Sequence, residues 1–156
     1  MAENKPYEKL SDLEKLQKQW HKLSGLNTRE EWSAAIVRAA TAAELAANFA
    51  VRNEFAGRSQ FNSKFVDSLL LWANGLAGKL DRLLLPLSAA DKDKNKKMKA
   101  LRDVAGKINA KRNAIAHQGE FCRGDEARAS IKHAREFIMG LVQLYEPTFQ
   151  LKDRKR

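Results

Sequence analysis

The strongest candidates for chemistry in this sequence are an arginine and a histidine five residues apart, Arg112 and His117. Imidazole titrates near neutral pH and can act as an acid or a base. A planar guanidinium can donate two parallel hydrogen bonds to phosphate oxygens. On a helical wheel of about 100° per residue, Arg112 lies in the middle of an apolar arc, and Asn109, Asn113 and His117 lie along one edge of it. The arc consists of Leu101, Val104, Ala105, Ile108 and Ile115.

A guanidinium centred on an apolar stripe needs a partner, because burying an unpaired charge is costly. One alternative is therefore structural. In that case Arg112 pairs with Glu44, the lone carboxylate of an alanine-rich segment, and His117 only caps the end of its helix. The two other histidines, His21 and His133, suit a helix end and a solvated helix face.

The sequence lacks the patterns that hold metals or nucleotide cofactors. No cluster of His, Asp and Glu residues has metal-ligand spacing. Cys122 is the single cysteine, which excludes an intramolecular disulfide and a Cys-rich zinc site. The chain also has no Gly-rich phosphate loop of the Rossmann or P-loop type. We therefore expect a protein that works without a metal or a cofactor.

The positive charge is concentrated in the second half of the chain. The 156 residues carry 29 Lys and Arg against 19 Asp and Glu, a formal net charge of +10. Residues 1–78 contribute a net +1, and residues 79–156 contribute a net +9. This asymmetry points to a polyanionic partner, with nucleic acid first. The densest clusters are a run of lysines (Lys92, Lys94, Lys96, Lys97 and Lys99) and a basic tail, which by itself we expect to be solvated.

Apolar residues at helical spacing predict five helices. Capping boxes that begin at Ser11 and Thr28 mark the first two helices, and Gly25 is expected to end the first one. Nine alanines within residues 34–50 suit the second helix to close packing in a bundle interior or a subunit interface. The predicted helices cover about residues 11–25, 28–57, 61–86, 98–117 and 124–147, with a polar loop and a frayed helix start at 88–97.

These elements predict an all-α fold, a four- to five-helix antiparallel bundle. A chain of this length forms one domain. We expect an N-terminal arm at residues 1–10, a single helical domain at 11–147 and a basic C-terminal tail at 148–156. No run of about 18 uncharged apolar residues occurs, and the N-terminus lacks the apolar region of a signal peptide. A cytoplasmic protein without a membrane segment is expected.

The segment Arg112-Asn113-Ala114-Ile115-Ala116-His117 resembles the R-x4-6-H motif of HEPN domains, in its common RN-x3-H form. The resemblance covers about residues 10–145, of which six match the motif closely. The context of the motif agrees with it: the motif ends a late helix, a glycine follows soon after, and one more amphipathic helix comes next. It implies a HEPN-like fold that forms homodimers and cleaves RNA without a metal. It also implies that Arg112 and His117 are catalytic, and that Asn113 is the polar residue that commonly follows the arginine.

This resemblance predicts an endoribonuclease that uses the 2′-hydroxyl of RNA as the nucleophile. Lys111 and Arg123 flank the motif and are expected to contact phosphates of the substrate. A toxin-like role in stress or defence would add an antitoxin or another regulatory protein as a partner. Some HEPN toxins that pair with a nucleotidyltransferase antitoxin carry a tyrosine two residues after the histidine. Here that position is Gly119, which does not support that particular toxin–antitoxin pairing.

Two further hypotheses remain open. A HEPN-like domain could act as a non-catalytic RNA-binding or protein-interaction module, since a fold does not fix a function. Alternatively, the chain could be a structural helical protein in which Arg112 is only one half of a core ion pair. In that case replacing Arg112 by methionine should be neutral or stabilising.

Overall fold

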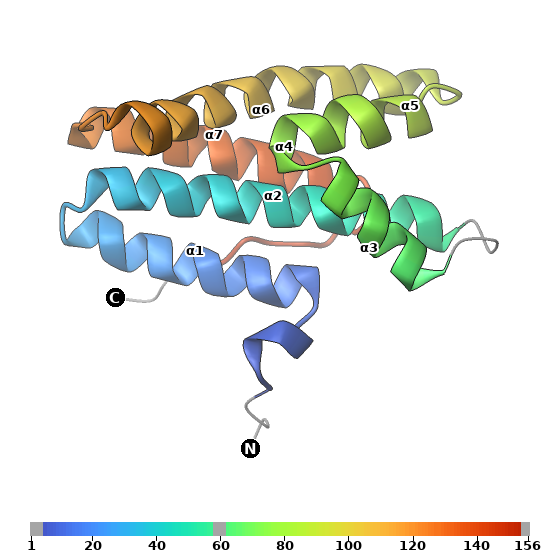
Figure 1. Ribbon diagram of the computed structural model, residues 1–156, viewed down its shortest axis with the longest axis horizontal. Helices are drawn as coiled ribbons and strands as arrows, with labels where there is room; N and C mark the ends of the chain where they lie inside the picture. Colours follow the sequence, from blue (N-terminus) through green and yellow to red (C-terminus); the bar gives the residue numbers. More distant parts are fainter. Residues whose placement is uncertain (1–4, 58–61, 154–156) are drawn as a thin grey trace.

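The computed structural model describes residues 5–57 and 62–153, and every regular element in these ranges is helical. Four long helices lie side by side: α1 (Asp12–Thr28), α2 (Trp32–Ala56), α6 (Lys92–Gln118) and α7 (Gly124–Val142) (Figure 1). A short 3₁₀ turn, Tyr7–Lys9, precedes α1. The prediction of an all-α protein is therefore confirmed.

The third predicted helix is interrupted. It comprises α3 (Ser63–Trp72), α4 (Gly75–Lys79), a π-helical turn at Leu80–Leu84, and α5 (Leu85–Leu87). The break falls at Ala73 and Asn74, and Gly75 follows with a φ of 79°, which favours glycine. Pro86 does not close this segment as expected; it lies in the first turn of α5, where a missing N–H costs little. Phe61, the predicted start of the segment, lies outside the described residues.

Helix α1 begins as predicted and ends later than predicted. The Ser11 hydroxyl accepts from the Glu14 N–H, and the Glu14 carboxylate accepts from the Ser11 N–H, both at 3.2 Å, which confirms the first capping box. Gly25 lies within the helix, because one glycine weakens a helix without ending it. The second predicted box is wrong: the Thr28 hydroxyl donates to the Ser24 carbonyl inside α1, at 2.9 Å.

Helix α6 begins six residues earlier than the predicted start at Met98. The carboxylate of Asp91 caps it by accepting from the Lys94 N–H at 3.1 Å. The side-chain amide of Asn95 donates to the Leu85 carbonyl at 3.3 Å and thereby joins α6 to α5. The first turns of α6 were predicted only as a loop with a frayed helix start, because their lysines show no apolar period, although lysine itself favours helix.

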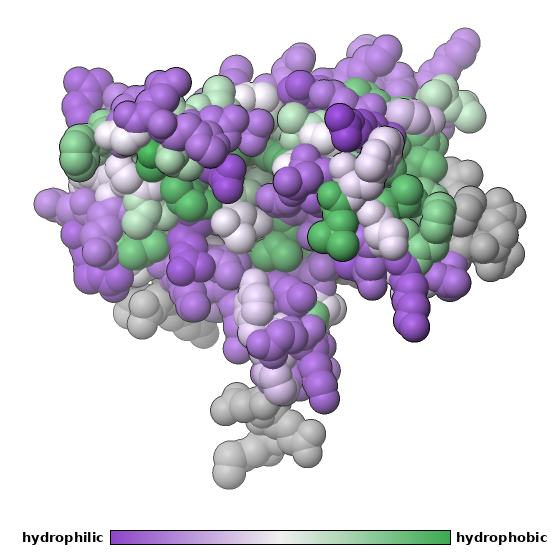
Figure 2. Space-filling view, viewed as in Figure 1, coloured by the Kyte–Doolittle hydropathy of each residue, from purple (hydrophilic) through white to green (hydrophobic). Residues whose placement is uncertain are grey.

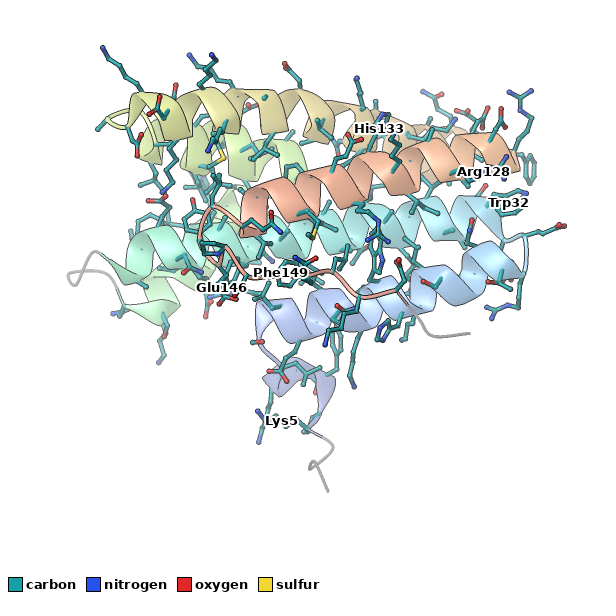
Figure 3. The ribbon with its side chains drawn as sticks, turned by 180° about the vertical axis from the view of Figure 1, so that it is seen from behind. Lys5, Trp32, Arg128, His133, Glu146 and Phe149 are labelled. Carbon is teal, nitrogen blue, oxygen red and sulfur yellow. The ribbon has the colours of Figure 1, made fainter. Side chains whose placement is uncertain are left out.

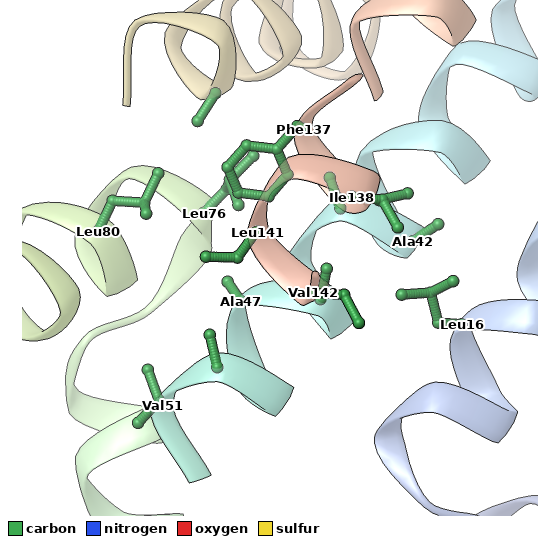
Figure 4. Close-up of a cluster of buried hydrophobic side chains, with 14 of the residues drawn as sticks. Leu16, Ala42, Ala47, Val51, Leu76, Leu80, Phe137, Ile138, Leu141 and Val142 are labelled. Carbon is green, nitrogen blue, oxygen red and sulfur yellow. The ribbon is translucent and has the colours of Figure 1, made fainter. Parts of the chain in front are cut away.

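The alanine-rich helix α2 forms the centre of the core. Eight of its nine predicted alanines are buried, and the helix contacts α1, α4, α6 and α7. Small side chains let these neighbours approach closely, and larger apolar residues such as Leu16, Phe137 and Leu141 fill the space between them (Figure 4). Helix α2 is also long and apolar enough to cross a membrane by length and composition alone. Its burial identifies it as a core helix, a class that passes the same test.

The chain that follows α7 returns along α1 (Figure 1). Gln17 and Lys152 exchange two hydrogen bonds, at 2.6 and 3.0 Å. The Trp20 indole N–H donates to the Asp153 carboxylate at 2.9 Å, and Leu151 is buried. Lys152, the described lysine of the basic cluster that we expected to be solvated, is exposed, whereas Leu151 before it belongs to the core. The last tail residues, at 154–156, lie outside the described residues.

Candidate functional site

The candidate site lies at the C-terminal end of α6, where the chain turns into α7. Gly119 ends α6 in the left-handed conformation, with φ 63° and ψ 27°, and its N–H donates to the Ala114 carbonyl. Glycine adopts this conformation without steric cost, so the stop predicted at Gln118–Gly119 is confirmed. His117 lies in the last turn of the helix, and its side chain is exposed.

Arg112 is exposed rather than directed into the core. Met98, Ala105 and Arg112 follow one another at intervals of seven residues and so lie along one face of α6. Met98 and Ala105 are completely buried. The segment that covers this line, Gly75–Leu87, spans only about 20 Å, whereas the 27 residues of α6 span about 40 Å. Figure 1 shows that the cover stops near the middle of α6. The helical wheel placed Arg112 correctly on the apolar face of α6, but the segment Gly75–Leu87 does not extend far enough to cover it.

The predicted ion pair between Arg112 and Glu44 does not form. Glu44 instead accepts from the ammonium of Lys79 at 2.8 Å, and the Lys79 side chain is only 5% exposed. Lys79 is the last residue of α4 and reaches the carboxylate on α2 from there. Glu44 thus neutralises a buried lysine and does not pair with Arg112.

In the part of the chain that the structure describes, the side chains of the three motif residues are free of partners: Arg112, Asn113 and His117. Within the described residues, none of the three makes a side-chain hydrogen bond or an ion pair. Asn113 is half-buried and the other two are exposed. Five residues of α-helix rotate the chain by about 140° beyond one full turn. Arg112 and His117 therefore leave α6 in different directions, so a single chain does not aim them at one point.

Lys111 does not face outward toward a ligand. Its ammonium donates to Glu120 at 2.7 Å and to Glu126 at 3.2 Å, and so ties α6 to the following loop and to the first turn of α7. The hydrogen bond that Lys111 donates to Glu120, and the second one that it donates to Glu126, raise the pKa of Lys111. The hydrogen bond from Lys111 lowers the pKa of Glu126 below its ordinary value. Lys111 is therefore a structural link, and the predicted phosphate contact is not available to it while these pairs hold.

A group of potential metal ligands surrounds this lysine. Ligand atoms of Glu120, Cys122 and Glu126 all lie within 4.8 Å of one another, which sequence spacing alone did not indicate. Lys111 already supplies a positive charge to both carboxylates. Burial raises the pKa of the Cys122 thiol, which disfavours the thiolate that a metal would need. The group is thus explained as an internal salt-bridge cluster.

Arg123, the second predicted phosphate contact, is exposed at the start of α7. Its guanidinium lies 3.3 Å from Asp125 and 3.9 Å from Glu126, and its side chain is 77% exposed. Exposed pairs of this kind contribute little to stability. The arginine can therefore exchange these carboxylates for a phosphate at small cost, in contrast to Lys111.

A shallow groove beside the motif was not predicted. It has a volume of 360 Å³ and lies between the first half of α2 and the end of α6. Ile115 lines it from α6, three positions after Arg112, and residues three apart are neighbours on a helix surface. The α2 residues that line it are Ser33, Ala34, Val37, Arg38 and Thr41. Arg38 is half-buried and donates to the Gln19 side-chain oxygen at 2.7 Å. The position of this arginine within the alanine-rich segment was a signal that we overlooked.

The basic cluster predicted at the start of α6 divides into two groups. Lys92, Lys96, Lys97 and Lys99 are exposed. Lys94 instead pairs with Glu54, and its ammonium lies 4.6 Å from the ring centre of Tyr145. Figure 2 shows hydrophilic residues along the edge formed by α6, with hydrophobic residues at the surface in the middle of the same face.

Aromatic and cationic side chains meet where α7 begins. An added Cβ at Gly124 would lie 3.2 Å from both Trp32 and the guanidinium of Arg128, which explains why a residue without a side chain occupies this position. Figure 3 shows Trp32 and Arg128 next to each other at this end of the molecule.

Comparison of the chain with protein-family models, with curated proteins and with solved structures finds no match.

Proposed function

We propose that this protein is a metal-independent endoribonuclease of the HEPN type that acts as a homodimer. The observation that carries the proposal is the state of Arg112 and His117. Both are exposed near the end of α6, and neither has a side-chain partner within the described residues. A guanidinium and an imidazole left uncommitted are suited to bind and transform an external anion.

The reaction requires only groups that the RNA and this chain contain. The 2′-hydroxyl attacks the adjacent phosphorus, the bond from phosphorus to the 5′ oxygen breaks, and one strand ends in a 2′,3′-cyclic phosphate. A base removes the proton of the 2′-hydroxyl, and an acid delivers a proton to the leaving 5′ oxygen. His117 can take either role, and Arg112 stabilises the charge that develops on the non-bridging oxygens.

A dimer resolves the divergence of the two side chains. Because Arg112 and His117 leave the helix about 140° apart, one chain presents them to different surroundings. A twofold pair supplies two guanidiniums and two imidazoles, so a composite cleft can combine groups from both chains. The groove beside Ile115 and the uncovered half of α6 form the face that we assign to this contact.

The same divergence favours one alternative, a non-catalytic RNA-binding module. Four exposed lysines at the start of α6 can hold a phosphate backbone without any chemistry. Such binding would weaken steeply with added salt, because each neutralised phosphate releases counterions. RNA recovered intact from a salt-sensitive complex would support this alternative.

Incubation of the purified protein with end-labelled RNA in EDTA tests the proposal. We expect the wild type to cleave, and both His117→Ala and Arg112→Ala to lose at least about 100-fold in rate. His21→Ala is the matched control, since it removes an exposed imidazole from α1. Cleavage by both motif variants at the wild-type rate would reject the proposal, as would wild-type protein that leaves RNA intact. Light scattering of the same samples tests the dimer.

A toxin-like role in defence or stress, in the cytoplasm and under control of an antitoxin or another regulatory protein, forms part of this proposal. Unrestrained cleavage of cellular RNA would arrest growth. Induced expression of the wild type should therefore stop bacterial growth, whereas His117→Ala should not. Equal growth of both strains at equal protein levels would remove the toxin-like role and leave the nuclease proposal to the test with RNA.

A further inference from the structure

Phe121 is the most exposed large hydrophobic residue of the described chain, with 95% of its surface open to solvent. It lies in the turn between α6 and α7, four residues after His117. Exposure of a whole phenyl ring to water is unfavourable, and a ring that is not buried does not stabilise the core. An aromatic residue at such a place is suited to a contact outside its own chain.

The turn holds this ring in a fixed position. Before it, the Glu120 carboxylate is tied to Lys111 at 2.7 Å. After it, Cys122 is half-buried, and its thiol lies within 4.8 Å of the Glu126 carboxylate. Residues 120 and 122 thus face the protein, while residues 121 and 123 face solvent. The ring is presented between two anchored neighbours rather than on a loose loop.

Charged residues of both signs flank this ring in the chain: Glu120 precedes it, and Arg123 follows it and contacts Asp125 and Glu126. Arg123, which is 77% exposed, follows Phe121 by two positions. Alternate residues of an extended segment point to the same side, about 6.6 Å apart. Arg128 lies one turn into α7, and no described side chain pairs with it. Arg123 can exchange its exposed carboxylate partners for a phosphate at small cost. An exposed aromatic ring together with such a guanidinium suits single-stranded nucleic acid, by stacking on the base and by contact with the backbone.

We infer that Phe121 stacks on an unpaired base of the RNA strand that the site binds. The inference rests on the proposed function, because it takes the strand bound at Arg112 and His117 to be RNA. In a double helix the faces of a base are covered by its neighbours, so the ring has nothing to stack on without extruding a base. A second copy of the chain is the competing occupant, and the oligomeric state of Phe121→Ala tests it.

Fluorescence anisotropy with a labelled, unstructured 12-nucleotide RNA and with its full duplex tests the inference. We expect Phe121→Ala to weaken single-strand binding by about 5- to 100-fold and to leave duplex binding unchanged. Phe121→Trp should retain wild-type affinity. Leu71→Ala is the matched control, because Leu71 is 80% exposed on α3, at the other end of the molecule.

An abasic nucleotide moved along the strand locates the contact. At one position it should weaken wild-type binding by the same factor as Phe121→Ala, and it should have no further effect in that variant. Unchanged binding by Phe121→Ala, additive effects at every position, or no binding of single strands by the wild type would each overturn the inference. A shift of Phe121→Ala from dimer to monomer would reassign the ring to a protein contact. These readouts do not depend on cleavage, which tests the proposed function separately.

Discussion

Ala105 and Arg112 lie on the same line along α6, one heptad apart, yet the alanine is completely buried and the arginine is exposed. The segment Gly75–Leu87, which contacts α6, extends along only about half of that helix (Figure 1). The guanidinium therefore remains in water, in a position that a continuous helix packing would have closed. Arg112 is therefore available for the role that we propose without being part of the core packing.

Replacement of Arg112 by methionine should leave the fold intact. An exposed side chain without a partner contributes little, so we expect the free energy of unfolding to change by less than about 0.5 kcal/mol. Urea denaturation followed by circular dichroism measures it. A loss well above 1 kcal/mol would mean that Arg112 has a core partner, as the structural hypothesis requires.

Glu44→Ala should destabilise the domain, because it leaves the buried ammonium of Lys79 without an acceptor. An unsatisfied buried donor costs about 1–3 kcal/mol. Lys79→Met removes the charge instead and should cost much less, since methionine fills the same space. Urea denaturation of both single variants and of the double variant gives the coupling energy. Equal losses for the two single variants would contradict the assignment.

Glu54→Gln should be the most destabilising of these changes. The Glu54 carboxylate accepts from the Tyr145 hydroxyl at 2.8 Å and also pairs with Lys94, and its side chain is 10% exposed. Loss of the charge from such a pair costs about 3–5 kcal/mol. Thermal unfolding by calorimetry would show it as a lower Tm. A variant as stable as the wild type would mean that the pair with Lys94 contributes nothing to the fold.

Because of Tyr145, we expect the stability of the fold to decrease at high pH. Burial, followed by the hydrogen bond to Glu54, raises the pKa of Tyr145 above its ordinary value of 10.0. Above pH 10 the unfolded chain loses the phenol proton while the folded chain keeps it, so stability falls as the pH rises further. We expect the wild type to lose stability above pH 10 and Tyr145→Phe to lose less. Parallel loss in both proteins would refute this.

Lys111→Met should alter the response to acid. The lysine lowers the pKa of Glu126, so the pair stabilises the fold above the ordinary value of 4.5 and loses this effect as the pH falls through the lower value. The stability difference between wild type and Lys111→Met should be largest near neutral pH and shrink below pH 4.5. Urea midpoints at pH 7 and pH 3.5 measure it, and a constant difference would contradict the role of the pair.

Local rules predicted the ends of elements where a side chain or a glycine acts on its own neighbours. The Ser11 capping box and the stop at Gly119 are of this kind. The rules failed where distant parts of the chain decide the outcome. Gly25 is held inside α1, and the exposure of Arg112 depends on the length of another helix. The carboxylate partners of Lys79 and Lys111 could not be predicted for the same reason. The packing of the helices brings each ammonium to its carboxylates, and the spacing of residues along the chain does not show these contacts.

The bond between Trp20 and Asp153 joins positions 133 residues apart. Synthesis from the N-terminus therefore produces the first helix long before the partner of its indole exists. Until Asp153 has left the ribosome, the surface that Leu151 covers stays open to water and to chaperones. Completion of this domain is thus an event that follows translation of its last helix, and a proteolytic cut just after α7 would return the molecule to that unfinished state.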